Sequence, residues 1–136
     1  MNFEETKNFK IESSSLKGVR IFAREIFKKS SILEKDSDDL VLALAEAAQN
    51  IVKHGYNNQP TEDEMKIIIK FNDNVLLMEL MDKGKPVVPS NIKPRDLDEI
   101  KSGGLGTFFI GQIMDEVVFK TTKINWVNHL ILTKAF

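Results

Sequence analysis

The chain has 136 residues, 42% of them hydrophobic, which is enough for one domain with a buried core. Its 19 basic and 20 acidic side chains nearly cancel, so no strong field draws it to nucleic acid or to an anionic membrane. The absence of cysteine excludes disulfides, cysteine nucleophiles and thiolate metal sites. Without a signal-peptide pattern or an apolar run of about 18 residues, we expect one cytoplasmic domain over residues 1–136.

The first part of the chain predicts one strand and two helices. Residues 7–11 alternate weakly between polar and apolar side chains, as an edge strand does. The serines at 13–15 offer N-cap hydroxyls for a helix that runs to about Lys29, with apolar side chains at helical spacing. An acidic cluster then precedes a second helix over about 38–54, which Gly55 ends.

The second part predicts two hairpins and a helix. The β-branched runs 65–71 and 75–81 flank an Asn-Asp-Asn triplet, which favours a tight turn between two strands. Residues 105–114 are an apolar run that predicts a third helix, and 116–121 with 126–133 predict a closing hairpin. Because hairpins dominate, we expect a two-layer α+β sandwich, with a mixed, mostly antiparallel sheet covered on one face by three helices.

A long connection over about 83–102 separates the first hairpin from the third helix. It contains three prolines, at 86, 89 and 94, and it is too long to be a simple turn. Loops of this length often cover an active site, so we interpret the segment as a lid.

The second helix carries polar side chains that suit phosphate chemistry. Glu46, Asn50 and His54 recur every four residues and therefore line one face. The carboxylate can accept a proton from an attacking hydroxyl, and the carboxamide offers a neutral oxygen to Mg²⁺. The helix by itself favours the simpler interpretation of a solvated face. His54 suits the capping of the helix end, and with only His129 besides it a multi-histidine metal site is excluded.

Two further clusters suit other parts of a nucleotide. Asp82, at a strand end, can accept a hydrogen bond from an exocyclic amine such as adenine N6, and Gly84 would let a flat ring approach the backbone. The run Gly103-Gly104-Leu105-Gly106 precedes a helix, where backbone N–H groups and the positive helix end can close on a phosphate. Taken singly, the residues Asp82 and Gly84 can form an ordinary turn, and the glycine run can be a plain loop. Three separate sites that suit one nucleotide are harder to dismiss than one.

The three clusters match the motifs of a known family. Residues 46–56 look like its N-box, residues 82–89 like its adenine-binding box, and residues 103–117 like its glycine-rich box and the helix after it. The chain therefore resembles the anti-sigma regulatory factor serine/threonine kinases of the GHKL superfamily, whose members share the Bergerat ATP-binding fold. The order and spacing of the motifs agree over nearly the whole chain.

The resemblance implies a role for each motif. Glu46 would be the general base that activates the acceptor hydroxyl, and Asn50 would ligate the Mg²⁺ that bridges the phosphates of ATP. Asp82 would bind the adenine amino group, with Gly84 against the ring, and Thr133 would place a hydroxyl near adenine. The residues that close over the phosphates would be Gly103, Gly104, Leu105, Gly106 and Thr107.

The resemblance also implies partners. Such kinases, usually homodimers, hold a sigma factor inactive and phosphorylate a serine or threonine on a STAS-type anti-sigma-factor antagonist. An arginine on their first helix contacts both partners, and Arg20 stands at the corresponding distance before the N-box, with Arg24 one turn later. An ordinary exposed helix residue is the alternative for Arg20.

The sequence also allows two competing functions. The chain can be a binding module that takes up ATP and controls a partner by contact alone, although the intact Glu46 argues against it. It can also be a detached catalytic domain of a histidine kinase. The short lid, and the lack of a helical segment with a phospho-acceptor histidine, place this possibility last.

Overall fold

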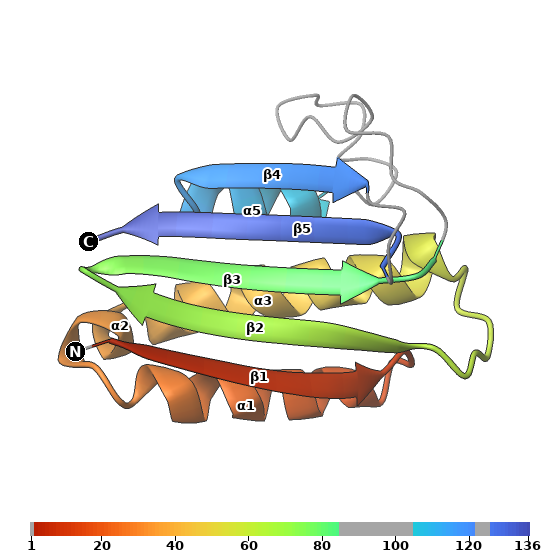
Figure 1. Cartoon of the computed structure of the whole chain (residues 1–136), viewed down its shortest axis with the longest axis horizontal. Helices are drawn as coiled ribbons and strands as arrows, with labels where there is room; N and C mark the ends of the chain where they lie inside the picture. Colours follow the sequence, from red (N-terminus) through yellow and green to blue (C-terminus); the bar gives the residue numbers. More distant parts are fainter. Residues whose placement is uncertain (1, 85–104, 122–125) are drawn as a thin grey trace.

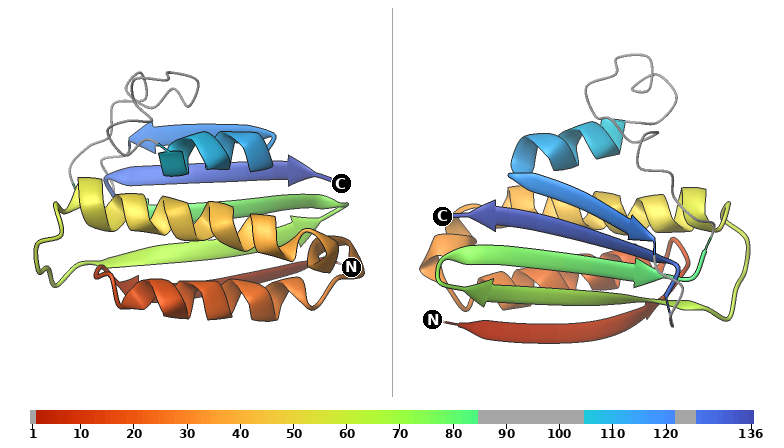
Figure 2. Two further views of the ribbon diagram at one scale, coloured as in Figure 1. Left: turned by 180° about the vertical axis from the view of Figure 1, so that it is seen from behind. Right: turned by 45° about the horizontal axis from the view of Figure 1, so that its top comes forward.

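The protein is a two-layer sandwich of one sheet and the helices that cover one of its faces (Figures 1 and 2). The computed structural model describes residues 2–84, 105–121 and 126–136. The sheet has five strands in the order β1-β2-β3-β5-β4, and all four neighbouring pairs are antiparallel. The predicted α+β class is confirmed, but the sheet is antiparallel throughout the described strands rather than mixed.

The elements follow the predicted order, with two additions. Their bounds are β1 Phe3–Lys10, α1 Ser15–Phe27, α2 Ser31–Lys35, α3 Ser37–Asn50, η1 Ile51–Gly55, β2 Glu64–Asn72, β3 Val75–Asp82, α5 Leu105–Ile113, β4 Glu116–Thr121 and β5 Asn128–Ala135. The short helix α2 and the π-helical turn η1 were not predicted from the sequence. A five-residue helix is too short for a periodic signal, and a π-turn has the same composition as the α-helix that it continues.

The first strand is longer than predicted. It begins at Phe3 instead of residue 7, and it pairs with β2 over its whole length, from Phe3 opposite Phe71 to Lys10 opposite Glu64. Polar side chains along this edge strand weaken the alternation that a sequence reading depends on. The backbone hydrogen bonds to β2 therefore determine the extent of the strand, because its own side-chain pattern does not.

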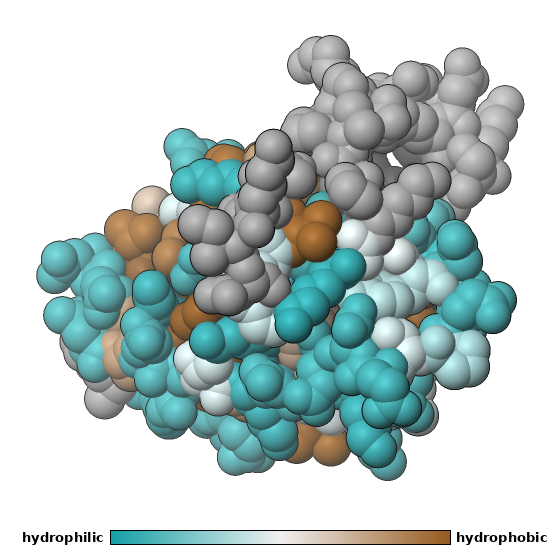
Figure 3. Space-filling view, turned by 45° about the vertical axis from the view of Figure 1, so that its right-hand side comes forward, coloured by the Kyte–Doolittle hydropathy of each residue, from teal (hydrophilic) through white to brown (hydrophobic). Residues whose placement is uncertain are grey.

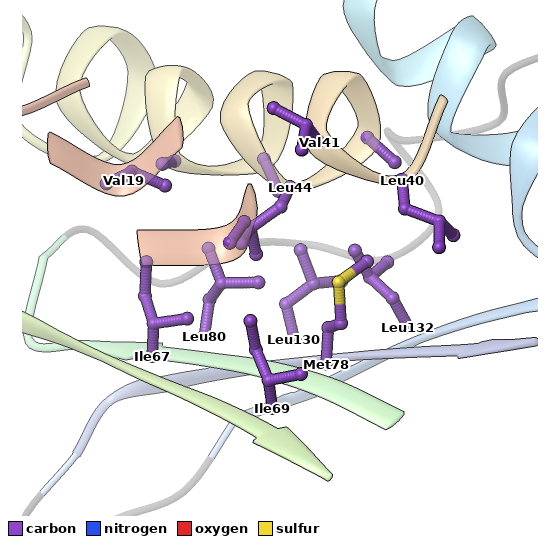
Figure 4. Close-up of a cluster of buried hydrophobic side chains, with 14 of the residues drawn as sticks. Val19, Leu40, Val41, Leu44, Ile67, Ile69, Met78, Leu80, Leu130 and Leu132 are labelled. Atoms are coloured by element: carbon purple, nitrogen blue, oxygen red, sulfur yellow. The ribbon is translucent and has the colours of Figure 1, made fainter. Parts of the chain in front are cut away.

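The core lies between the sheet and the helices. Alternate residues of β2 and β3 point toward the helices and are buried, and α1 and α3 supply the opposing apolar side chains (Figure 4). Each fully buried side chain of this size contributes about 1.5–3 kcal/mol, which makes this interface the main source of stability. The labelled members are Val19, Leu40, Val41, Leu44, Ile67, Ile69, Met78, Leu80, Leu130 and Leu132.

Helix α3 lies in the middle of the helical layer. It packs against α1 on one side and α5 on the other, and Figure 2 shows all three helices on the same face of the sheet. Its carboxyl-terminal end lies at the same end of the molecule as the carboxyl end of β3 (Figure 1). This arrangement brings the second helix and the first hairpin, which carry two of the predicted motifs, to one place.

The other face of the sheet carries the buried carboxylate of Glu79 with two partly exposed partners, His129 and Lys70. Glu79 alternates with the core residues Met78 and Leu80, so its side chain lies on the face that the helices leave uncovered. Its Oε1 lies 2.8 Å from Nε2 of His129, and its Oε2 lies 3.6 Å from Nζ of Lys70. The cross-strand partners therefore satisfy this carboxylate without a covering helix. Of the helices in the described part of the chain, none is long and apolar enough to cross a membrane.

Candidate active site

Asp82 ends strand β3 in a buried position. It is only 4% exposed, and its Oδ1 accepts two hydrogen bonds, from Nδ2 of Asn128 at 3.0 Å and from the backbone N–H of Gly84 at 2.8 Å. Asn128 is held there because it stands opposite Asp82 in the β3–β5 ladder. Both hydrogen bonds that the described residues make to this carboxylate fall on Oδ1, and none of them falls on Oδ2.

Burial controls the electrostatics of this carboxylate. Removal from water raises the pKa of Asp82 above its ordinary value, and the negative charge of Asp63 adds to the rise. The hydrogen bonds from Asn128 and Gly84 oppose the rise because they stabilise the charged form. A buried acceptor of this kind favours a ligand that brings a donor of its own, as an exocyclic amine does.

The π-turn that follows α3 reaches the strand end at Asp82. Glu46 and Asn50 are half-buried and lie one turn apart, and the π-turn Ile51–Gly55 follows Asn50 directly. A Cβ atom added to Gly55 would lie 3.8 Å from Oδ1 of Asp82, so the turn reaches the strand end. Local π geometry is frequent at functional sites, and here it directs the chain from the Asn50 helix onto Asp82.

Gly84 is required by its neighbours in the protein. A Cβ atom added there would lie 2.6 Å from Cε1 of Tyr56 and 2.7 Å from the carbonyl oxygen of Gly55. Such distances are well inside van der Waals contact, and one of the two atoms belongs to the backbone. The predicted reason for the glycine was the approach of a ligand ring. That role stays a prediction, but close packing against Tyr56 and Gly55 is by itself sufficient.

The sequence predicted no role for two polar residues of the site, although the first of them ends the motif over residues 46–56. Tyr56 donates a hydrogen bond from its hydroxyl to Oδ2 of Asp63 at 2.8 Å and accepts one from the backbone N–H of Lys83 at 3.2 Å. Asn128 was missed, although it is a polar residue at the start of an alternating strand. The alternation indicates which face of the sheet it lies on. Tyr56 left a weaker signal, namely an aromatic residue directly after the glycine that ends the helix.

The predicted position of Thr133 is wrong. Thr133 pairs with Leu77, whereas Asp82 pairs with Asn128. The two pairs lie five positions apart along β5, a distance of about 17 Å at the rise of an antiparallel strand. The odd spacing also places Thr133 on the opposite face of the sheet from Asn128. The sequence predicted the strand but not its register, and Asn128 is the β5 residue that adjoins Asp82.

The glycine-rich segment is described only in part. Gly103 and Gly104, and the lid beyond Gly84, lie outside the described residues. Leu105, Gly106 and Thr107 form the first turn of α5, whose amino-terminal end lies at the same end of the molecule as the ends of α3 and β3 (Figures 1 and 2). The positive end of the helix dipole is therefore directed toward the side of the molecule that carries Asn50 and Asp82.

The predicted partner residue lies on the outer surface of the helical layer. Arg20 is exposed on α1, and Arg24, one turn later, forms an ion pair with Asp38 at 2.8 Å. Arg20 is therefore accessible to another protein, whereas Arg24 helps to hold α1 against the start of α3. The two ends of this pair are well exposed, so its contribution to stability is small.

We expect Gly84→Ala to destabilise the fold by about 1–3 kcal/mol and to weaken nucleotide binding, because the new methyl group must displace Tyr56 or the backbone of Gly55. Urea unfolding and calorimetry measure the two effects. Gly18→Ala is the matched control. Its Cβ would meet Phe9 at an ordinary 3.6 Å inside α1, so this variant should be more stable by about 0.5–1 kcal/mol. Equal stability of the two variants would contradict the packing argument.

The fold and the site define a nucleotide-binding domain of the ATPase and kinase class. A buried acceptor at a strand end, an adjoining helix with a carboxylate and a carboxamide, and the start of a second helix lie at one end of the sandwich. On the surface near that end, the residues drawn in colour are mainly hydrophilic (Figure 3).

Comparison with known proteins identifies the family. The sequence profile of the histidine kinase-like ATPase domain matches residues 9–134, and the chain belongs to this family. It is 30% identical over 115 residues to the serine-protein kinase RsbW of Staphylococcus aureus strain bovine RF122 / ET3-1, covering 78% of this chain and 72% of that protein. The same enzyme from strain JH9 matches equally. The chain is accordingly an anti-sigma regulatory serine/threonine kinase of the GHKL type.

A solved structure shares the fold. The crystal structure of the SiaB-SiaC complex from Pseudomonas aeruginosa contains a chain that superposes with a TM-score of 0.66, covering 97% of this chain and 88% of that one. The sequence identity is 14%, so the likeness concerns the arrangement of the strands and helices. It supports the Bergerat-type sandwich that the motifs imply.

Proposed function

We propose that this kinase acts in the cytoplasm as an anti-sigma factor in a partner-switching system and phosphorylates a STAS-type antagonist with ATP. The observation that carries the proposal is the contact between Gly55, in the turn that follows the Glu46–Asn50 helix, and the Asp82–Gly84 strand end. One nucleotide can reach both groups only if these elements adjoin. The serine-protein kinases of Staphylococcus aureus that resemble this chain support the choice of a hydroxyl acceptor on a protein.

Each group of the site has a distinct task in this proposal. The Oδ2 atom of Asp82 accepts a hydrogen bond from the adenine amino group, because Oδ1 is occupied by Asn128 and Gly84. Asn50 contributes a neutral oxygen to Mg²⁺. The glycine-rich residues Gly103–Thr107 and the start of α5 supply backbone N–H groups to the phosphates.

The magnesium ion needs the nucleotide to complete its coordination. Within the ranges that the structure describes, no three His, Asp or Glu side chains gather as a metal cluster. One protein oxygen, several waters and the phosphates of the substrate form the usual set for Mg²⁺ in such sites. When bound, the ion neutralises charge on the transferred phosphoryl group.

Glu46 prepares the acceptor in this proposal. It lies one helical turn before Asn50 and is half-buried. It accepts the proton of the serine or threonine hydroxyl as that oxygen attacks the γ-phosphorus of ATP, while the bond from this phosphorus to the β–γ bridging oxygen breaks and ADP leaves. Phosphoryl transfer otherwise needs mainly positioning and charge neutralisation, which the remaining groups supply.

The partners are expected to bind the helical layer. Arg20 is exposed there and is the residue that we propose for contact with both the sigma factor and the antagonist. The solved relative is a complex of two proteins, which supports a function through partners. We also propose a homodimer, as in the relatives that the motifs resemble.

A phosphorylation assay tests the proposal directly. Purified protein with MgATP is incubated with each STAS-domain protein encoded in the same genome, and mass spectrometry locates the phosphate. We expect one of these proteins to gain a single phosphate on serine or threonine. If none is modified while MgATP still binds in calorimetry, the proposed phosphorylation of a STAS-type antagonist is wrong, and control of the partner by contact becomes the better account.

A further inference from the structure

We infer that Tyr56 is a positioning residue that couples the helix carrying Glu46 and Asn50 to the strand end carrying Asp82. The inference rests on the proposed function and deepens it, because it names a residue that sets the geometry of the nucleotide site without touching the nucleotide. Tyr56 follows the π-turn directly and lies beside Gly84 and Lys83, so it belongs to the helix end by sequence and to the strand end by contact.

The contacts of Tyr56 tie three segments together. Its hydroxyl donates to Oδ2 of Asp63 at 2.8 Å and accepts from the backbone N–H of Lys83 at 3.2 Å. Its ring fills the space that a Cβ of Gly84 would need, with Cε1 only 2.6 Å from that position. The Lys83 peptide lies between Asp82 and Gly84, so anchoring it fixes the carboxylate and the turn after it.

The loop after Tyr56 is built to return Asp63 to the hydroxyl. Asn57 and Asn58 adopt left-handed φ angles of 51° and 58°, which turn the chain sharply. The N–H of Asn58 donates to the carbonyl of Val52 at 2.9 Å, and the N–H of Asp63 donates to Oγ1 of Thr61 at 3.0 Å. These bonds hold both ends of the loop, and Asp63 is thereby presented to Tyr56.

The electrostatics keep Tyr56 in its donor form. Burial raises the pKa of the Tyr56 hydroxyl well above its usual range, and the hydrogen bond to Asp63 and the negative charge of that carboxylate add to the rise. The hydroxyl therefore stays protonated near neutral pH and can donate to Asp63. Asp63 in turn raises the pKa of Asp82, so the same carboxylate acts on both residues.

The connection matters because ATP must contact both elements at once. The base is expected at Asp82, and the phosphates with their ion at Asn50. If the strand end shifts relative to the helix, both contacts cannot be made with good geometry, and a displacement of about 1 Å is enough to impair a site of this kind. The Tyr56 hydroxyl connects the helix end to the strand end, because it accepts a hydrogen bond from the backbone N–H of Lys83.

The test is a double-mutant cycle with MgATP binding as its main measurement. Calorimetry on the full chain compares wild type, Tyr56→Phe, Asp63→Ala and the double variant. We expect each single variant to bind MgATP about tenfold more weakly, because that loss corresponds to the free energy of one or two buried hydrogen bonds. The double variant should bind no more weakly than either single variant. Asp63→Asn keeps an oxygen acceptor for the hydroxyl and should retain most of the affinity.

Thermal unfolding without nucleotide separates positioning from general stability. The inference is overturned if the losses of MgATP affinity in the two single variants add up in the double variant and parallel the falls in melting temperature. That result would show a structural role only. Affinities of Tyr56→Phe and Asp63→Ala within twofold of wild type would also overturn the inference. If wild type itself binds no MgATP, the proposed function fails together with the inference, whereas failure of the variants alone leaves the proposed function intact.

Discussion

Replacing Asp82 by asparagine should reduce the affinity for MgATP by about a hundredfold and leave the fold at least as stable as wild type. The amide oxygen can keep both hydrogen bonds that Oδ1 now accepts, from Asn128 and Gly84. The amide nitrogen then stands in place of Oδ2 and presents a donor to the adenine amino group, which is itself a donor. Calorimetry measures the affinity, and urea unfolding measures the stability.

The stability of Asp82→Asn should also depend on pH in a defined direction. The pKa of Asp82 is raised in the folded protein, so the folded state binds this proton more tightly than the unfolded state does. Wild type therefore loses stability as the pH rises from the ordinary value of 3.8 through the raised folded value. The asparagine variant lacks this loss, so its advantage over wild type should be small in acid and grow toward neutral pH.

Asp115→Asn is the matched control for this substitution. The Asp115 side chain is exposed and its Oδ2 accepts the N–H of Ala135, at the end of β5 remote from Asn128. The affinity of this variant for MgATP should equal that of wild type. If Asp82→Asn binds MgATP as well as the control does, Asp82 does not recognise the base and the assignment of the site is wrong.

Replacing Glu46 by glutamine should slow phosphorylation of the antagonist by about two to four orders of magnitude, the usual contribution of a general base. The side chain keeps its size and its place on α3, but it can no longer accept the proton of the acceptor hydroxyl. Binding of MgATP should change by less than twofold, because the nucleotide contacts are assigned to Asn50, Asp82 and the glycine-rich segment. Single-turnover phosphorylation at saturating MgATP measures the rate.

Glu34→Gln, an exposed change on the short helix α2, serves as the control and should phosphorylate at the wild-type rate. A Glu46→Gln variant that retains both full phosphorylation and full cellular function would remove Glu46 from the mechanism. If it loses phosphorylation but keeps every cellular function, control of the partner by contact becomes the better account. The Asp82 and Glu46 variants together separate recognition of the nucleotide from the chemical step.

Most of the fold was predictable because its elements carry strong local signals. The hairpin of β2 and β3 shows alternating apolar side chains around an Asn-Asp-Asn turn, and Asp73 and Asn74 indeed adopt left-handed φ angles of 52° and 62°. Helices α1 and α3 have apolar residues at helical spacing, and these are the ones that become buried. The extension of β1 was not predictable, because its pairing with β2 outweighs its own weak pattern.

The residues of the candidate site were predictable where they belong to a motif that is local in the chain. Glu46 with Asn50, and Asp82 with Gly84, are read from consecutive or helically spaced residues, and the structure places both pairs at one end of the molecule. Asn128 was missed and Thr133 was misplaced because both depend on the register of β5 against β3. A shift in register exchanges the residues that face the site, and the apolar pattern of a strand does not show which partner residue stands opposite.

The sequence by itself determined the class of fold, the order of the elements and the family, since periodicity, turn residues and spaced motifs are properties of the chain alone. The tertiary structure decided which polar groups meet. The hydrogen bonds of Asp82 with Asn128 and of Tyr56 with Asp63 and Lys83, like the packing of Tyr56 on Gly84, join different segments of the chain. Such contacts depend on strand register and on the path of a loop, which are fixed only when the core packs.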